Sequence, residues 1–268
     1  MNKLKTFWRY LWRFAVINAV SCVFALAVFV TLAVTKFIDM PFIARYDLIL
    51  IVLVLVQIIL VWRKWETVDE LKTILLFHVI GLILEIFKVN MGSWSYPEDA
   101  ITKIAGVPLY SGFMYSSVAS YIVAAWKRLK IDTIHWPKNC LTFSILSLLY
   151  VNFFTEYFFI DLRWWLMIIF FVIFWRTWFT FQIYEKRFKI PTVVAFMLIS
   201  FFIWLAENIS TFFNAWQYPD QVEKWTIVGF GKISSWFIMV AIQVVLVANL
   251  KRIKKRQASQ KSCRVANQ

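Results

Sequence analysis

The sequence has few of the residues on which common catalytic sites depend. Two histidines exclude a histidine-rich di-iron centre, and the three cysteines, Cys22, Cys140 and Cys263, lack the spacing of a metal site. There is no glycine-rich phosphate loop, dinucleotide fingerprint, His-Glu-x-x-His stretch or paired-aspartate motif. With six glycines in the chain, helices broken by glycine at a central ion site are not expected either. We therefore predict no metal and no cofactor.

Charge is scarce as well. Only 16% of the residues are charged, whereas 61% are hydrophobic and 19% aromatic, a far more apolar composition than that of a soluble domain. About 20 apolar residues suffice to cross a bilayer, and a soluble fold could not bury so many such runs. We predict an all-α, multi-pass transmembrane helical bundle of about eight helices, at residues 14–35, 47–62, 73–90, 108–126, 139–158, 164–184, 191–211 and 229–250.

The positions of the cations predict the orientation. With the amino terminus in the cytoplasm, 21 Lys and Arg residues fall on inner segments and seven at or near the outer side, as the positive-inside rule requires. Both termini are therefore predicted to be cytoplasmic, with residues 251–268 as a basic, disordered tail. The net charge of +14 is explained by cations that flank helices and contact anionic lipid headgroups. Membrane lipids are the expected partners, and no nucleic acid is expected.

One motif occurs twice. Glu85 is followed by Trp94-Ser-Tyr96-Pro-Glu98, and Glu207 is followed at the same spacing by Trp216-Gln-Tyr218-Pro-Asp220. Both copies end long apolar runs that cross in the same direction. The spacing predicts two parallel four-helix repeats, residues 1–126 and 127–250, related by an axis along the membrane normal with any site at their interface.

Both glutamates lie within apolar helices, where an ionisable group is costly and usually functional. Glu156 is expected at a similar depth near the end of the fifth helix. A carboxyl in a dry site tends to stay protonated and can act as an acid at neutral pH. Glu85, Glu207 and Glu156 are therefore the candidate catalytic residues.

The surrounding aromatic and polar residues are candidates for substrate binding. An aromatic belt at the membrane interface would also account for the four aromatic residues of the two motifs. Lys88 is three residues after Glu85 on one helical face and is expected to pair with it. The candidate substrate-binding residues are Trp94, Tyr96, Trp216, Tyr218, Asn208, Lys88 and Lys232.

Two further residues bear on the choice of function. His78 lies two turns deeper than Glu85 on the same face, where it either relays a proton or bonds to a neighbouring helix. Arg176 is expected within the sixth helix, where it either reaches the headgroups or pairs with an acid such as Glu185.

Several stretches resemble a known family. These are Glu85-Ile-Phe-Lys-Val-Asn-Met-Gly-Ser-Trp-Ser-Tyr-Pro-Glu98, Gly106-Val-Pro-Leu-Tyr-Ser-Gly-Phe-Met-Tyr115 and Trp204-Leu-Ala-Glu-Asn-Ile-Ser-Thr-Phe212. They are similar to an uncharacterised bacterial membrane family, domain of unknown function 817, across nearly the whole chain. The resemblance implies a multi-pass protein of a bacterial plasma membrane and supplies no activity.

Three functional hypotheses remain open. The first is an enzyme that uses the glutamates for acid–base chemistry on a lipid-like substrate such as an isoprenoid, with aromatic walls stabilising a cationic intermediate. It predicts a groove open to lipid with the carboxylates facing each other. The second is a transporter or binding protein for a proton, cation or small solute, with a polar path inward through His78 towards Arg176. The third is a structural protein in which the cluster clips helices together.

Overall fold

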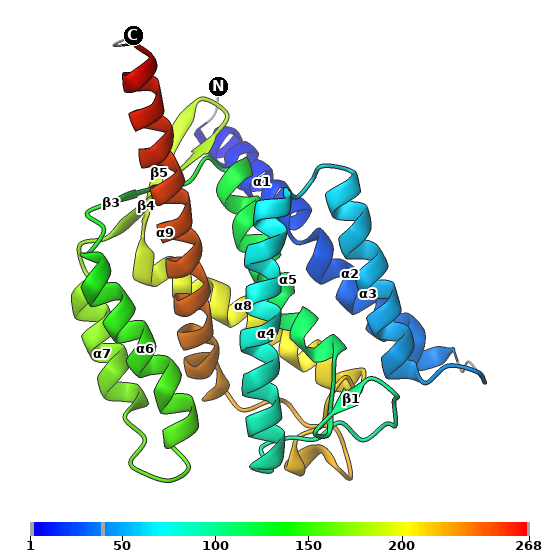
Figure 1. The fold of residues 1–268 in the computed structure, drawn as a ribbon. Helices are drawn as coiled ribbons and strands as arrows, with labels where there is room; N and C mark the ends of the chain where they lie inside the picture. The colour runs from blue at the N-terminus through cyan, green and yellow to red at the C-terminus, as the bar shows by residue number, and fades with distance from the viewer. Residues whose placement is uncertain (1–2, 39–40, 267–268) are drawn as a thin grey trace.

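A computed structural model describes residues 3–38 and 41–266, with side chains as far as Ile253. The chain forms a bundle of helices with two small antiparallel sheets (Figure 1). The helices are α1 (Lys3–Ser21), α2 (Val23–Phe37), α3 (Arg45–Trp62), α4 (Val68–Asn90), α5 (Tyr110–Arg128), α6 (Asn139–Thr155), α7 (Arg163–Phe174), α8 (Thr192–Phe212) and α9 (Lys232–Ala266). The strands are β1 (Lys103–Ile104), β2 (Val107–Pro108), β3 (Asp132–Ile134), β4 (Trp178–Ile183) and β5 (Lys186–Pro191), and a short 3-10 helix η1 spans Pro219–Gln221.

Local sequence explains where several helices begin and bend. Thr67 caps α4 in a capping box, with its side chain bonded to the backbone N–H of Glu70 and the Glu70 carboxylate bonded to the N–H of Thr67. The first predicted helix, residues 14–35, is a pair of helices, α1 and α2, bent by 64° at Cys22. Each of the other seven predicted runs coincides with one helix over most or part of its length.

The sixth predicted helix, residues 164–184, is wrong in its second half. Helix α7 ends at Phe174, and β4 follows and pairs in register with β5 from Trp178↔Pro191 to Ile183↔Lys186. Aromatic and β-branched residues alternate with polar ones along β4, a pattern that suits a strand with one packed face. The turn is made by Tyr184, whose φ is 52°. Arg176 therefore lies in the turn before β4 and not within a helix.

The carboxyl-terminal segment also differs from the prediction. Residues 251–268 were expected to form a disordered tail, whereas α9 continues as a helix through Ala266. Between Lys251 and Ala266 there is neither glycine nor proline to end the helix. Lys251 bonds to Glu70 at 3.0 Å, which ties the start of this extension to α4.

The same packing occurs in both halves of the chain. Helix α4 packs against α5 as α8 packs against α9, and α2 packs against α3 as α6 packs against α7. Likewise α2 contacts α5 and α6 contacts α9, while α5 and α9 contact each other between the halves. These matched contacts are those that two parallel repeats would make, although the duplication itself stays a prediction.

Burial separates the centre of the bundle from its surface. In the apolar part of α9, 72% of residues are buried, against 28–33% in α3, α4 and α8. The outer helices thus leave many large apolar side chains exposed, including Ile58, Val79 and Phe202. A soluble protein avoids such a surface, whereas hydrocarbon chains cover it.

The structure is that of a helical membrane bundle. Among the described residues, four helices are each long and apolar enough to cross a membrane, and the bent pair α1–α2 would make a fifth. Helices α6 and α7 are apolar but shorter. The multi-pass architecture is confirmed, and eight crossings stay a prediction. The start of α1, the end of α9 and the β3–β4–β5 sheet lie at one end, and the β1–β2 hairpin with the α8–α9 loop lies at the other (Figure 1).

Candidate functional site

Glu85 lies near the end of α4 and is held by three aromatic donors. Its side chain is 4% exposed. The indole N–H of Trp94 and the hydroxyl of Tyr96 both donate to Oε2, at 2.7 and 2.8 Å. The hydroxyl of Tyr115 on α5 lies 2.7 Å from Oε1. Both carboxylate oxygens thus have hydrogen-bond partners within the protein although the residue is buried.

Glu207 has a closely related environment near the end of α8. It is 3% exposed, with the hydroxyl of Tyr218 at 2.6 Å from Oε1 and the indole N–H of Trp236 at 2.8 Å from Oε2. In both halves the tyrosine eleven residues after the glutamate returns to it. The loop that carries the motif therefore folds back over the helix end, where its proline is placed to end the turn.

The two motif loops pair with each other. The backbones of Ser95 and Gln217 form an antiparallel bridge with two N–H···O bonds of 2.9 Å. The rings of Trp94 and Tyr218 meet edge to face at 5.8 Å, and those of Tyr115 and Trp236 lie 6.0 Å apart. Donors of one glutamate thus contact donors of the other, and the two carboxylates interact electrostatically. We use the name glutamate pair for Glu85 and Glu207 together with the five aromatic residues that donate to them: Trp94, Tyr96, Tyr115, Tyr218 and Trp236.

Lys232, the first residue of α9, is the cation beside the glutamate pair. Its Nζ lies 4.5 Å from the ring centroid of Tyr218 and 4.9 Å from that of Trp94, within the range of a cation–π contact. Its charge also acts on the Glu207 carboxylate. The structure therefore brings together Glu85, Glu207, Trp94, Tyr96, Tyr218 and Lys232 of the residues named from the sequence.

Trp216 occupies a different position from the one that the motif suggests. Trp94 donates directly to Glu85, but Trp216 hydrogen-bonds to Tyr218 instead of Glu207. The equivalent donor to Glu207 is Trp236, which comes from the next helix. Neither Trp236 nor Tyr115 was named from the sequence, because no short spacing links them to the glutamates. The only signal was that each lies on the helix after the motif, 29 or 30 residues beyond its glutamate.

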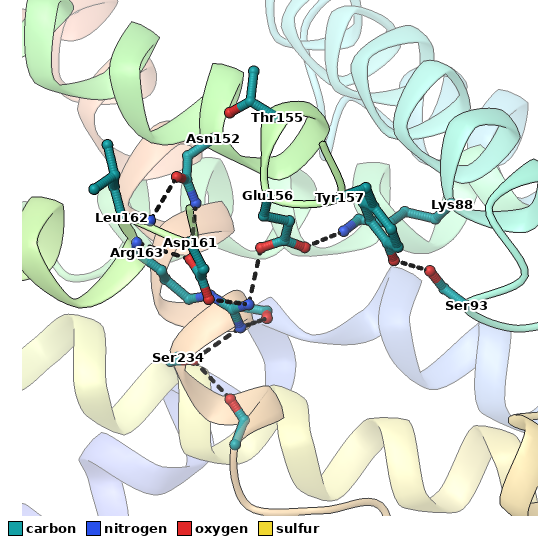
Figure 2. A network of polar contacts seen from close by, with 12 residues as sticks. Lys88, Ser93, Asn152, Thr155, Glu156, Tyr157, Asp161, Leu162, Arg163 and Ser234 are labelled. Atoms are coloured by element: carbon teal, nitrogen blue, oxygen red, sulfur yellow. Dashed lines mark hydrogen bonds and ion pairs between the residues drawn. The ribbon is translucent and has the colours of Figure 1, made fainter. Parts of the chain in front are cut away.

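Glu156 and Lys88 belong to a separate chain of ion pairs (Figure 2). Lys88 was expected to pair with Glu85, but its Nζ lies 2.5 Å from Glu156 Oε1, because the helix turns it towards α6. Glu156 Oε2 accepts from Arg163 at 2.9 Å, and Arg163 also bonds to Ser235 on α9 at 3.0 Å. With both oxygens engaged by cations, Glu156 fastens α4, α7 and α9 together, and the structure does not place it in the glutamate pair.

Asp161 ends this chain in the turn before α7. It accepts the N–H of Arg163 at 2.9 Å and pairs with the guanidinium of the same residue at 3.1 Å. Partial burial raises the pKa of Asp161, but hydrogen bonds from Arg163 and Asn152 outweigh this effect and leave the pKa below its usual value. Asp161 is therefore held as a charged partner of Arg163 at neutral pH.

Asn208 has a structural position. Its side chain accepts the backbone N–H of Val228 at 2.9 Å and donates to the carbonyl of Trp204 at 2.8 Å. It therefore anchors the α8–α9 loop to α8, and none of these bonds joins it to the glutamate pair.

Another buried carboxylate, Glu66, lies just before α4, at the opposite end of that helix from Glu85. It is 5% exposed and accepts from the amide of Gln57 at 2.5 Å and from the hydroxyl of Ser120. Glu66 was not named from the sequence because it falls in the turn after a short apolar run. No group of three or more His, Cys, Asp or Glu side chains within the described ranges is arranged to hold a metal ion.

Comparison with known proteins places the chain among uncharacterised relatives. Residues 10–244 match the model of a family described as "Protein of unknown function (DUF817)". The chain is 51% identical over 239 residues to "Uncharacterized protein YoaT" of Bacillus subtilis (strain 168), and the match covers 89% of this chain and 90% of that relative. No solved structure matches. The resemblance expected from the sequence is confirmed, and it assigns no activity.

Proposed function

Because this chain belongs to the DUF817 family of unknown function, we propose its function from the site itself: a membrane carrier whose coupling proton binds to Glu85 and Glu207. The observation that carries the proposal is the charge balance of the glutamate pair. Two carboxylates that are 4% and 3% exposed share their surroundings with one lysine, Lys232. Two like charges in a dry site tend to hold one proton between them, and one proton balances this set of charges.

The hydrogen-bond donors suit both protonation states. An indole N–H can only donate, so the oxygens that face Trp94 and Trp236 are acceptors in every state. A tyrosine hydroxyl can donate or accept. The hydroxyls of Tyr115 and Tyr218, each facing the Oε1 of one glutamate, can therefore donate to a carboxylate or accept from a carboxylic acid. A proton can therefore bind or leave while each glutamate keeps the same hydrogen-bond partners.

Buried polar atoms continue inward from the glutamate pair. Gln243 on α9 donates to the backbone carbonyl of Tyr115 at 3.3 Å, and its Oε1 has no partner. Among the described residues, His78 Nδ1 on α4 and Ser111 Oγ on α5 are also buried without a hydrogen-bond partner. Such atoms are costly in a dry apolar interior. The three helices that carry them contact one another in series, which supports a polar path beside α5 and α9. Arg176, towards which this path was expected to run, lies in the turn before β4, and the inner part of the route stays a prediction.

The enzyme hypothesis remains the second candidate. The aromatic walls around two carboxylates are what an acid-catalysed reaction through a cationic intermediate requires. However, Glu85 and Glu207 are only 4% and 3% exposed, so the reacting part of a lipid-like substrate would have to displace protein side chains to reach them. A proton needs no such displacement. The structural hypothesis accounts for Glu156 and its ion pairs but not for carboxylates whose direct partners are neutral donors.

Proton uptake into liposomes tests the carrier proposal. The purified full-length protein would be reconstituted with a pH-sensitive dye inside, and a potassium diffusion potential would drive protons inward. Wild type is expected to acidify the interior, and Glu85→Gln/Glu207→Gln to match empty liposomes. Glu98→Gln is the control, because it removes a carboxylate that pairs with Arg45 outside the glutamate pair.

A second measurement covers a carrier that moves protons only together with its solute. Infrared difference spectra of wild type across a pH titration should contain the carbonyl band of a carboxylic acid that gains or loses its proton, and this band should be absent from both single Glu→Gln variants. If wild type gives neither proton uptake nor this band, the proposal is wrong.

A further inference from the structure

The ammonium group of Lys232 sits in an aromatic cage. Its Nζ lies 4.5 Å from the centroid of Tyr218 and 4.9 Å from that of Trp94. The two rings stand at 76° to each other, so they form two walls of a corner. The Glu207 carboxylate supplies negative charge to the same space. Aromatic faces joined by a carboxylate are the chemistry by which proteins bind alkylammonium ligands.

Lys232 differs from the neighbouring cations in what it contacts. Lys88 and Arg163 each reach Glu156, at 2.5 and 2.9 Å. No hydrogen bond or ion pair joins the ammonium of Lys232 to another side chain among the described residues, although an ammonium has three donors. Ring faces and a diffuse negative charge favour an alkylated, weakly hydrated cation over one that needs directed hydrogen bonds.

The walls of the cage do not depend on Lys232. Trp94 is held by its 2.7 Å bond to Glu85, and Tyr218 by its 2.6 Å bond to Glu207. The Ser95–Gln217 bridge fixes the two loops against each other. A cage that is held by other residues stays formed when the lysine leaves, which lowers the cost of binding a different cation.

The segment before Lys232 leaves room for that movement. Gly229 and Gly231 precede it, and a Cβ added at either glycine would meet no atom within 4 Å. Residues 222–227 are exposed, and Lys232 itself is partly exposed. Val228 is anchored to α8 through Asn208, so the movement is confined to the residues after it and to the long side chain of Lys232, which can withdraw at the rim of the bundle.

We propose that Trp94, Tyr218 and Glu207 form a binding site for the ammonium group of an organic cation, which Lys232 occupies when that cation is absent. This inference rests on the proposed carrier and names its solute class. When the organic cation replaces the ammonium group of Lys232, the net charge beside the two glutamates stays the same. The solute therefore binds without leaving an unpaired charge in the bundle.

Binding to Lys232→Ala tests the site. The full-length variant in detergent would be titrated with tetramethylammonium chloride, with tryptophan fluorescence and the thermal midpoint as readouts and sodium chloride as the ionic-strength control. The expected result is a saturable change that is absent from Lys232→Ala/Glu207→Gln. Lys189→Ala is the matched control, because it removes a lysine lying 5.1 Å from the ring of Trp178 on the β4–β5 hairpin, at the opposite end of the bundle from the α8–α9 loop (Figure 1). A response no larger than that of Lys189→Ala overturns the proposal.

Wild type supplies a test that does not depend on the folding of a variant. Tetramethylammonium should displace Lys232 and increase its acylation by an amine-reactive reagent, measured by mass spectrometry with Lys189 as the internal standard. Acylation of Lys232 that stays constant in both salts counts against displacement and overturns the inference. Neither experiment requires a proton gradient. Proton uptake without ammonium binding would refute this inference alone, and ammonium binding without proton exchange would refute the carrier's proton coupling alone.

Discussion

Glu85 and Glu207 differ in how many donors hold them. Glu85 accepts from Trp94, Tyr96 and Tyr115, whereas Glu207 has Tyr218 and Trp236. A hydrogen bond to a buried charged group contributes about 1.5–3 kcal/mol. The loss of one donor therefore leaves Glu85 better satisfied than Glu207.

Phenylalanine substitutions of the motif tyrosines test this difference. Both Tyr96→Phe and Tyr218→Phe should lower the free energy of unfolding by about 1–3 kcal/mol, and Tyr218→Phe should cost more because Trp236 alone remains. Denaturant unfolding in detergent measures both. Tyr157→Phe is the control, since its hydroxyl contacts Ser93 in an exposed position. An equal or larger cost for Tyr96→Phe would contradict the account.

At the scale of elements, α4 and α5 approach closely at two glycines. A Cβ on Gly81 would lie 2.4 Å from the ring of Tyr115, and one on Gly112 would lie 2.7 Å from the ring of His78. Ordinary carbon contacts lie near 3.5–4.0 Å. Close approach of the backbones is thus what lets the Tyr115 hydroxyl reach Glu85 from the neighbouring helix.

Gly81→Ala should disturb both packing and the glutamate pair. The added methyl group must displace Tyr115, at a cost of about 1–3 kcal/mol in unfolding free energy, and should weaken the bond from its hydroxyl to Glu85. Thermal unfolding in detergent measures the first effect and the infrared carboxyl band the second. Gly229→Ala, which meets no neighbour within 4 Å, should change neither. Similar midpoints for the two variants would show that α4 and α5 can separate without cost.

At the scale of the whole molecule, the β1–β2 hairpin and the α8–α9 loop lie at the opposite end of the bundle from the start of α1 and the end of α9 (Figure 1). The predicted orientation places the termini in the cytoplasm and the motif loops outside. Cytoplasmic termini and a plasma-membrane location stay predictions, because packing alone does not distinguish the two sides of a bilayer.

Labelling of intact cells tests the orientation. Glu223→Cys, in the exposed α8–α9 loop, would be placed in a chain whose three cysteines have been replaced by serine. A membrane-impermeant thiol reagent should label Glu223→Cys in intact cells. Lys189→Cys, on the β4–β5 hairpin, should react only after the cells are opened. The reverse pattern would place the glutamate pair on the cytoplasmic side.

The amino-acid sequence by itself determined the helical membrane bundle and those residues of the site that lie within one copy of the repeated motif. Long apolar runs specify helices in a bilayer whatever their neighbours. The repeated motif named Glu85, Tyr96, Glu207 and Tyr218 as candidate site residues, and each tyrosine bonds to the glutamate eleven residues before it, although the bonds themselves were not predicted.

Tertiary structure alone decided the partners that come from other helices. Tyr115 and Trp236 reach the glutamates, Glu156 is engaged by Lys88 and Arg163, and β4 replaces the end of a predicted helix by pairing with β3 and β5. The physical reason is that the sequence allows several possible partners for each side chain. The rotation of each helix and the distance between packed helices decide which of these partners it contacts. A side chain three residues from Glu85 can face Glu85 or the next helix, and only packing fixes which.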